Sequence, residues 1–466
     1  MQHDQSMTHP VTNPVTNPVA NPAHRAENQS HPAQNLAAES IGLEELLDLA
    51  PRAVACPHQV FAPLRDQGPL HFIEETGCYA VTRFDDVFDV VRDPVRFSSR
   101  MPTGPHAGAA LMARIGEVAA SSPEMAAMVG KAFSRSSSVL LSADPPDHGR
   151  QRRLVNTAFG PKRVGAMEAA IVAIANDLVD AFIERGEVDL VTEFAVGLPL
   201  TVIAKALGVE DRELATFKSW SDVLVVLVGN HKPSLEQIAE YVRVQVEFAD
   251  YFSDKIDQRR AEPKDDLITD VVQARIKEDD GSETELTVPE MLSMFQQFLV
   301  AGNETTTKLI ASMMRLLVEN PEVLSEVQAD PTLADKLVEE ALRLETPVQG
   351  LYRQANVATE VGGCPVEAGS HLWVLYASGN RDERKFPEPD RLDLHRENLK
   401  QHLSFSQGPH YCIGATLARA EGRVAVQTLL ARLRNIAFHP TKNTFEYEPS
   451  YVLHGLKHLW LTFDKA

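Results

Sequence analysis

Hydrophobic residues recur at helical spacing through most of this chain of 466 residues. Apolar positions three and four residues apart predict helices over 164–185, 235–259 and 416–433. The longest apolar stretch runs from Met291 to Leu317. Its start is well marked, because Thr287-Val-Pro-Glu290 has the spacing of a capping box with proline in the first turn. We therefore expect a long buried helix at this point of the chain.

Strand signals are fewer and lie in short segments. Residues 70–73 and 79–83 flank a turn and predict a hairpin. More β-type sequence occurs at 359–366, 371–376 and 451–463. The pattern as a whole predicts a mostly α fold with a small β region.

The first 40 residues differ in composition from the rest. They contain the near-repeat Val11-Thr-Asn-Pro14, Val15-Thr-Asn-Pro18 and Val19-Ala-Asn-Pro22, and they have no aromatic residue. Such a tract buries too little apolar surface to offset the entropy lost when it becomes ordered. We predict a disordered tail over 1–40. Because the motifs described below must converge on one site, we predict a single domain over 41–466.

Charge and hydropathy narrow the classes of function. The formal net charge of −20 argues against a nucleic-acid-binding protein, which needs a basic footprint. The sequence has neither a signal-peptide core nor eighteen uninterrupted apolar residues, so neither secretion nor a membrane anchor is indicated. Cys56, Cys78 and Cys364 are far apart and form no metal-ligand spacing, which favours a reducing, cytoplasmic compartment.

Cys412 is the first candidate for chemistry. It lies in Phe405-Ser-Gln-Gly408-Pro-His-Tyr-Cys412-Ile-Gly414, which leads directly into a helical pattern. Gly408 and Gly414 permit a sharp turn and close approach to a flat ligand, because glycine has no side chain to clash. The N–H groups at the start of the following helix should lower the pKa of the Cys412 thiol. The alternative is a small buried cysteine in a glycine-containing turn.

A second candidate lies inside the long apolar stretch, at Ala301-Gly302-Asn-Glu304-Thr305-Thr306. Glycine in a helix interior costs about 1 kcal/mol relative to alanine, so we expect Gly302 to leave space for a ligand. Glu304 and Thr305 place an acid and a hydroxyl in an otherwise apolar helix, where a buried charge is costly without a partner or a task. The alternative is that Thr305 and Thr306 bond back to carbonyls of the preceding turn.

These two segments resemble the haem-binding loop and the oxygen-activation segment of the cytochrome P-450 haem-thiolate monooxygenases. The resemblance implies that Cys412 is the axial thiolate ligand of a haem b, which is bound non-covalently because the chain has no Cys-x-x-Cys-His motif. It also implies that Thr305 hydrogen-bonds the activated oxygen, that Glu304 passes protons to it, and that Ala301 lies against the cofactor. Ser406 departs from the family pattern, in which many members have a further glycine.

Glu340 and Arg343 form a candidate structural pair in a helix predicted over 333–345. They share a helix face, but Glu339 is four residues from Arg343 and could pair with it equally well. The resemblance selects Glu340, because the family has a Glu-x-x-Arg pair behind the haem. It also implies a surrounding network formed by residues 380–382, 386–389 and Arg391.

Basic residues are placed as the carboxylates of a haem would require. His148 and Arg152 lie four residues apart at the start of a helical pattern, and Arg353 and His410 follow later in the chain. The resemblance assigns all four as partners of the haem propionates. A guanidinium is suited to this role because it bonds a carboxylate in a bidentate way. Taken alone, each of the four is more typical of an ordinary surface charge.

The predicted substrate pocket is apolar, which suits a terpenoid, steroid, fatty acid or aromatic guest. The segments expected to line it are 100–141, 220–232, 295–300, 348–351 and 452–456. Residues 101–138 are rich in small side chains and are interpreted as a mobile lid or a tolerated surface insertion. The side chains expected to line the pocket are Phe295, Phe298, Leu299, Val348 and Leu351.

Two classes of function remain open. The favoured one is a monooxygenase that inserts one atom of O₂ into a small to medium apolar substrate, with electrons from a ferredoxin and an NAD(P)H-dependent ferredoxin reductase. The alternative is a haem sensor or carrier without turnover, or a peroxide-driven haem-thiolate enzyme. The Glu304–Thr305 pair favours the monooxygenase, because a sensor needs no proton relay. The residues expected to meet an acidic ferredoxin are Arg153, Lys162, Arg163, Lys400 and Arg419.

Overall fold

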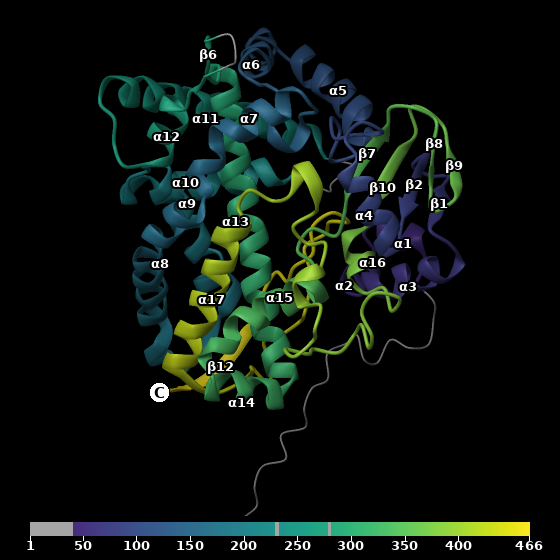
Figure 1. Cartoon of the computed structure of the whole chain (residues 1–466). Coiled ribbons are helices and arrows are strands. Elements are labelled where there is room, and N and C mark those ends of the chain that lie inside the picture. The colour runs from purple at the N-terminus through teal and green to yellow at the C-terminus, as the bar shows by residue number, and fades with distance from the viewer. Residues whose placement is uncertain (1–40, 229–232, 278–280) are drawn as a thin grey trace, which may run out of the picture.

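The computed structural model describes residues 41–228, 233–277 and 281–466, and the predicted tail over 1–40 lies outside them. Helices make up most of the described chain and pack around one long central helix, α13 (Figure 1). The described helices are α1 (Leu43–Leu47), α2 (Pro51–Ala55), α3 (Pro57–Gln67), α4 (Phe84–Arg92), α5 (Pro105–Ala120), α6 (Pro123–Ser134), α7 (Asp147–Val155), α8 (Pro161–Phe182), α9 (Gly197–Ala206), α10 (Leu214–Val225), α11 (Leu235–Ala261), α12 (Leu267–Gln273), α13 (Val288–Glu319), α14 (Pro321–Ala329), α15 (Ala334–Glu345), α16 (Tyr376–Asn380) and α17 (Ala415–Arg432).

The strands form small sheets at the edges of this helical body. One sheet has the order β1-β2-β10-β7-β3, in which β10 runs parallel to β2 and antiparallel to β7. A second has the order β11-β12-β4. The described strands are β1 (Leu70–Ile73), β2 (Cys78–Val81), β3 (Phe97–Ser98), β4 (Glu187–Asp189), β5 (Ile276–Lys277), β6 (Glu283–Thr284), β7 (Leu351–Ala355), β8 (Thr359–Val361), β9 (Cys364–Val366), β10 (His371–Val374), β11 (Leu433–Phe438) and β12 (Trp460–Lys465).

The central helix begins where the capping box predicts. The Thr287 N–H donates to Glu290 Oε2 at 2.8 Å, and the Glu290 N–H donates to Thr287 Oγ1 at 3.4 Å. From Thr306 to Leu317 every residue of α13 is buried, which is typical of a helix at the centre of a fold. In Figure 1, α13 passes through the middle of the molecule with α17 beside it. The mostly α fold with a small β region is confirmed.

Other predicted elements also appear. The helices expected over 164–185, 235–259, 333–345 and 416–433 correspond to α8, α11, α15 and α17, with short turns of tighter helix after α8 and before α15. The hairpin predicted from the first strand signals is β1 and β2, paired antiparallel with Leu70 opposite Val81.

Two of the later strand predictions need correction. Residues 359–366 form the hairpin β8–β9 and not one strand, because Gly362 and Gly363 turn the chain with φ of +57° and +79°. The segment 371–376 is strand only as far as Val374, and α16 begins at Tyr376.

The C-terminal strand is shorter than predicted. Within 451–463 regular strand begins only at Trp460. The backbone that precedes β12 bonds to the residues between α15 and β7. The Gln349 N–H donates to the Val452 carbonyl at 2.7 Å, and Leu453 forms an isolated bridge with Val348. These bonds hold 451–456 as a loop beside β7 instead of extending β12.

Residues 101–138 contain the helices α5 and α6. Ser122 caps α6, because its Oγ accepts the Met125 N–H at 3.1 Å. The two helices pack on α11 through a small apolar cluster of their own, which includes Ile115, Met125 and Ile238. This cluster makes α5 and α6 an integral layer of the fold.

Candidate active site

The central helix presents an open face at the predicted oxygen-activation segment. Ala301 is exposed although it lies in the middle of α13, whereas Asn303 and Thr306 on other faces of the helix are buried. The Thr305 hydroxyl donates to the Ala301 carbonyl at 2.7 Å. Since residues four apart share a helix face, Ala301 and Thr305 define this open face together.

Gly302 does not have the orientation that the sequence led us to expect. A Cβ at Gly302 would meet Ile203 of α9 at 3.7 Å, which is an ordinary contact. The space left by its missing side chain therefore lies toward α9. The small residue on the open face is Ala301.

Glu304 has a cationic partner one helical turn further on. Lys308 Nζ lies 2.9 Å from Glu304 Oε2, and the two side chains are 6% and 18% exposed. The acid expected to pass protons is thus part of a nearly buried ion pair. Sequence analysis missed Lys308, although its position four residues after Glu304 is a spacing at which helical side chains meet.

The cysteine loop is closed by backbone bonds and by residues in left-handed conformations. The Cys412 N–H donates to the Phe405 carbonyl at 2.8 Å. Gly408 has φ +69°, and a Cβ there would lie 2.9 Å from the Cα of Arg92, so only glycine fits. Ser406 also has a positive φ, of +57°, which explains why glycine suits this position. The serine keeps the turn and accepts some backbone strain.

Burial raises the pKa of the Cys412 thiol. The N–H groups of Gly414 and Ala415 and the guanidinium of Arg152 act in the opposite direction, as expected for the start of a helix, but they do not outweigh burial. The helix N–H groups thus lower the pKa as predicted, but the net shift of the Cys412 pKa is upward because burial is the larger effect. A bound metal ion would supply the missing stabilisation, because coordination deprotonates a thiol outright.

Four basic side chains from three distant segments gather next to this loop. The rings of His148 and His410 lie 4.0 Å apart between centroids. Burial, and next the nearby charges of Arg353, His148 and Arg152, together lower the pKa of His410 to about 2. Burial, and next the charge of Arg152, lower the pKa of His148. We call His148, Arg152, Arg353 and His410 the cationic cluster; its charge lies on the two arginines, because the lowered pKa of each histidine leaves its imidazole neutral at neutral pH.

The cationic cluster lacks an anionic partner within the described part of the chain. Arg152 donates to the Asn156 side chain, and buried Arg353 donates to the Tyr352 carbonyl. The Nε2 atom of His410 is buried without a hydrogen-bond partner. Two guanidinium cations beside imidazole groups that can donate N–H bonds fit a ligand that carries carboxylates.

Arg343 and Glu340 form a bidentate pair in the protein interior. Both are 0% exposed, and Arg343 donates to Glu340 at 2.7 and 2.8 Å. Arg343 also donates to the carbonyls of Asn380 and Pro389 at 3.0 and 2.6 Å. This network joins α15 to the segments expected from the sequence.

The additional arginine of this network is Arg396 and not the side chain of Arg391. Arg396 donates to Glu340 at 3.2 Å. Arg391 supplies only its backbone carbonyl, while its exposed side chain pairs with Glu388. No helix spacing indicates Arg396, because it lies 56 positions after Glu340 in an irregular segment.

Glu339, the alternative to Glu340, has partners of its own. It accepts from Arg419 at 2.6 and 3.0 Å and lies 2.9 Å from the Nε2 of buried His402. Hydrogen bonds from His402 and Arg419 hold the pKa of Glu339 down at about 2, although burial opposes them. The Arg419 guanidinium also lies 4.5 Å from the centre of the Phe405 ring. Arg419 is therefore a structural support of the cysteine loop and not a free surface charge.

Three of the five predicted pocket side chains are packed into the core. Phe295 lies 5.3 Å from Phe252 of α11, and Phe298 lies 4.7 Å from Phe159, between ring centroids. Leu299 is fully buried in the same cluster. These side chains have almost no surface left for a ligand, which contradicts the prediction that they line a pocket. Because α13 is apolar on several faces, its apolar residues do not identify the pocket face.

Val348 and Leu351 are partly buried and remain candidates for the lining, together with Val300 beside Ala301. The Leu141 N–H donates to Gln297 Oε1 at 3.4 Å, and Gln297 Nε2 donates to the Val139 carbonyl at 3.0 Å. These bonds hold the end of the 100–141 segment against α13. Residues 229–232 of the predicted 220–232 lining lie outside the described residues.

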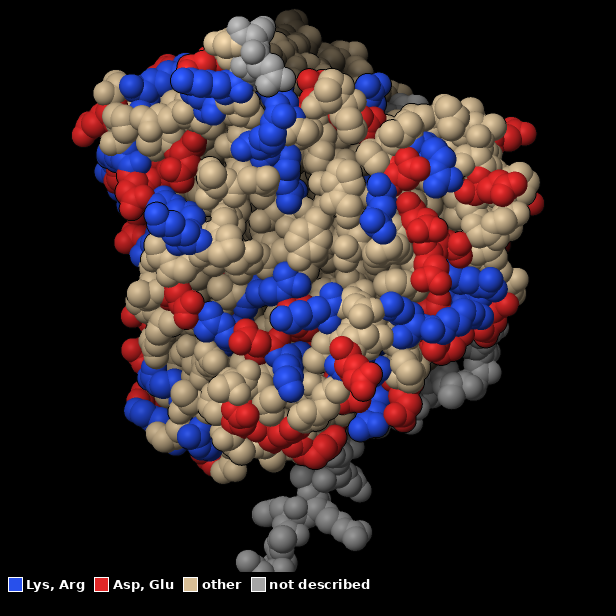
Figure 2. Space-filling model, in the orientation of Figure 1, with Lys and Arg blue, Asp and Glu red and all other residues tan. Residues whose placement is uncertain are grey.

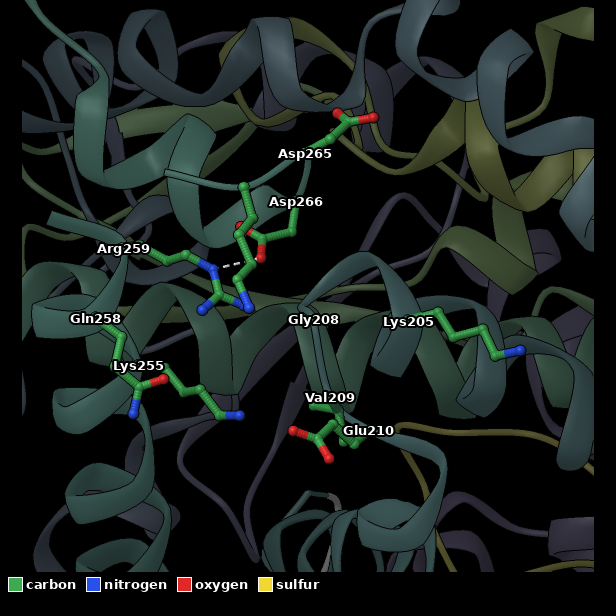
Figure 3. A pocket seen from close by; sticks show the side chains of 10 residues that line it. Lys205, Gly208, Val209, Glu210, Lys255, Gln258, Arg259, Asp265 and Asp266 are labelled. Carbon is green, nitrogen blue, oxygen red and sulfur yellow. Dashed lines mark hydrogen bonds and ion pairs between the residues drawn. The ribbon is translucent and has the colours of Figure 1, made fainter. Parts of the chain in front are cut away.

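A separate hollow of about 310 Å³ opens beside α9 and α11 (Figure 3). It is lined by charged side chains, and Arg259 donates to Asp266 at 2.6 Å on its wall. No residue predicted for the active site contributes to it. Its charged lining does not suit an apolar guest.

Comparison with known proteins identifies the family. The cytochrome P450 family profile matches residues 105–460. The cytochrome P450 monooxygenase PikC of Streptomyces venezuelae is 35% identical over 413 residues, which cover 87% of this chain and 90% of PikC. A steroid C26-monooxygenase of Mycobacterium tuberculosis is 33% identical over 328 residues, 70% of this chain and 86% of that protein. The structure of cytochrome P450 CYP109Q5 from Chondromyces apiculatus superposes with a TM-score of 0.75 at 36% identity, and covers 90% of this chain and 98% of that chain.

The chain belongs to the cytochrome P450 family and is a cytochrome P450 monooxygenase. The family implies a haem with cysteine thiolate ligation. The residues present fit such a group, because the cationic cluster and the orphaned Nε2 of His410 are suited to two propionates beside the partly buried Cys412. Within the described ranges, no helix is both long enough and apolar enough to cross a membrane.

Proposed function

We propose that this enzyme inserts one oxygen atom from O₂ into a small to medium apolar substrate, using a haem b that Cys412 ligates without thioether bonds. The observation that carries the proposal is the convergence of the cationic cluster on the cysteine loop, beside the helix on which Ala301 is exposed and Thr305 is half-buried. One site thus combines three features: positive charge for two carboxylates, a thiol for a metal ion, and an open helix face for a gas and a substrate.

Each group in the site has a distinct task. When bound, the haem supplies the chemistry that reduces O₂ and makes one of its atoms available for insertion. His148, Arg152, Arg353 and His410 bind and orient the propionates, and Cys412 fixes the metal. The Thr305 hydroxyl is held by the Ala301 carbonyl, and it has to leave that acceptor in order to donate a hydrogen bond toward the open face.

Glu304 lies next to Thr305 and holds the proton supply. Lys308 holds the Glu304 carboxylate through a hydrogen bond. Because Thr305 is the next residue of α13, a proton that reaches Glu304 has only to pass to the neighbouring side chain. A positioned acid contributes on the order of 10²–10⁴-fold to proton transfer. This relay supports turnover and disfavours a sensor or carrier, which needs no protons.

An apolar substrate agrees with the side chains around the open face. Val300, Val348 and Leu351 are partly buried aliphatic groups, and Leu141 is 38% exposed beside α13. Burying such surface against a guest contributes about 25 cal/mol per Å². The relative from Mycobacterium tuberculosis acts on a steroid, which is a guest of this chemical class.

Electrons come from a ferredoxin and its NAD(P)H-dependent reductase in this proposal. Figure 2 shows the face that carries α15 and α17, where Lys and Arg side chains lie across the middle, interspersed with Asp and Glu, although the net charge of the protein is −20. Arg153, Lys162 and Lys400 are exposed. Arg163 is tied to Asp265 and Arg419 to Glu339, so these two of the five expected residues serve the fold.

The test is a reconstituted reaction under ¹⁸O₂ with NAD(P)H, a ferredoxin, its reductase and a panel of terpenoids, steroids, fatty acids and aromatic hydrocarbons. Guests that fit are first selected by the shift of the ferric Soret band to shorter wavelength. A product that gains one ¹⁸O atom and needs NAD(P)H supports the proposal. If guests bind but products form only with added peroxide, or do not form at all, the proposal fails.

A further inference from the structure

Lys308 is nearly buried in the central helix, directly beside the oxygen-activation segment. Only 6% of its side chain is exposed, although lysine is rarely buried without a partner. The partner recorded for its ammonium group is Glu304 at 2.9 Å. The pair is charge-assisted, and it stands one turn of α13 away from the Thr305 hydroxyl.

The fold makes room for the lysine stem at a second position. Gly455 lies in the loop before β12, and a Cβ there would come within 2.3 Å of Lys308 Cγ and 3.0 Å of Lys308 Cδ. Any other residue at 455 would displace the lysine stem. Two distant segments thus combine to place one ammonium group against Glu304: α13 supplies the lysine, and the 451–456 loop supplies the space.

An exposed ion pair at the same spacing on another helix shows how the burial of Lys308 differs from the usual case. Lys218 and Asp222 on α10 are also four residues apart and form an ion pair, but their side chains are 35% and 53% exposed. Solvent screening makes such a pair worth little, and its geometry constrains nothing else. At Lys308 the stem is enclosed, so the ammonium has few positions other than the one at Glu304.

We propose that Lys308 is a positioning residue for the oxygenation reaction: it holds the Glu304 carboxylate in the orientation from which a proton passes toward Thr305. This inference rests on the proposed function, because it assumes that Glu304 feeds protons to the open face. Without the ammonium group, the Glu304 side chain is free to turn, and protons reach the site from less ordered sources. Reductant is then consumed without product, because a misplaced group loses most of its catalytic effect.

The experiment compares the holoenzyme with Lys308→Met, Lys308→Arg, Glu304→Gln and the double variant Lys308→Met/Glu304→Gln. Methionine keeps an unbranched stem against Gly455 and removes only the charge, while arginine restores a cation. The matched control is Lys218→Met on α10. Product and hydrogen peroxide are measured per NAD(P)H, substrate binding is measured by Soret titration, and the midpoint of thermal unfolding is measured for all variants.

We expect Lys308→Met to lower product per NAD(P)H by roughly tenfold and to raise peroxide accordingly, with the substrate dissociation constant unchanged. Lys308→Arg should recover part of the yield, and Lys218→Met should equal the wild type. In the Glu304→Gln background, Lys308→Met should not lower product per NAD(P)H any further, because the carboxylate that Lys308 positions is already absent.

Unfolding gives a readout that does not depend on turnover. Removing one partner leaves a nearly buried charge unpaired, so each single variant should melt below the double variant. Additive losses of yield and of melting temperature would overturn the inference, as would unchanged coupling in Lys308→Met. If instead the wild type itself gives no oxygenated product, the proposed function fails, and the unfolding cycle still reports whether Lys308 and Glu304 act as a pair.

Discussion

A buried carboxyl group beside the active helix makes the stability of this enzyme depend on pH. Glu421 of α17 is 2% exposed and forms a hydrogen bond with Thr306 of α13. Burial raises the pKa of Glu421 from 4.5 to about 8, and the bond to Thr306 offsets only part of this effect. The group is therefore protonated in the folded protein at neutral pH and ionised in the unfolded chain.

The sign of the effect follows from proton binding. Below pH 4.5 Glu421 is protonated in both the folded and the unfolded state, so it does not change the free energy of unfolding. Between 4.5 and about 8 the unfolded state releases it and the folded state keeps it, so stability falls as pH rises. The slope from one proton is about 1.4 kcal/mol per pH unit, which amounts to roughly 3 kcal/mol between pH 4.5 and pH 7.

Glu421→Gln removes the ionisable group and keeps a hydrogen-bonding side chain of the same shape. We expect the variant and the wild type to have similar free energies of unfolding near pH 4.5, and the variant to be more stable by roughly 3 kcal/mol at pH 7. Urea titrations followed by circular dichroism at pH 5, 6, 7 and 8 measure the difference. The matched control is Glu397→Gln at an exposed position. Parallel curves for Glu421→Gln and the wild type would refute the assignment.

Two further predictions concern turnover. Thr305→Ala should keep consuming NAD(P)H but release hydrogen peroxide in place of product, with the yield reduced on the order of 10²-fold; unchanged coupling, measured by product and peroxide per NAD(P)H, would remove the role assigned to the hydroxyl. Lys400→Glu and Lys162→Glu should slow the first electron transfer from an acidic ferredoxin at low ionic strength and leave substrate affinity unaltered. Stopped-flow reduction rates that are indifferent to these changes and to salt would exclude this docking face.

The sequence predicts those features of the fold that are determined by a few consecutive residues, such as a helix start or a tight turn. The start of α13 follows from Thr287 and Glu290, whose side chains and backbone satisfy each other within one turn. The turn at Gly408 follows from the residue itself, because glycine adopts its φ of +69° without strain. Both features are decided by a few consecutive positions, so no tertiary information is needed.

Features that depend on tertiary contacts could not be read in this way. Phe295 and Phe298 are as apolar as pocket residues, and only the positions of Phe252 and Phe159 show that they belong to the core. The choice of Glu340 over Glu339 for Arg343 is fixed by Arg419 and His402, which occupy Glu339 from other segments.

The pKa of Cys412 is another property that the sequence alone does not give. The helix N-terminus that lowers it is visible as a pattern, whereas the burial that raises it depends on everything packed around the loop. The sequence predicts the direction in which each effect moves the Cys412 pKa, but it does not predict which effect is larger. The same holds for Glu421, whose charge appears ordinary in the sequence and whose surroundings make it neutral.

The central claim is that Cys412 is the thiolate ligand of a haem. The most direct measurement is the absorption spectrum of the reduced protein with carbon monoxide, for the wild type and for Cys412→Ser purified in the same way. The wild type should show the long-wavelength band that is diagnostic of sulfur ligation, and Cys412→Ser should lack it while the other three cysteines remain. A wild type without that band, or a Cys412→Ser variant that keeps it, would contradict the account.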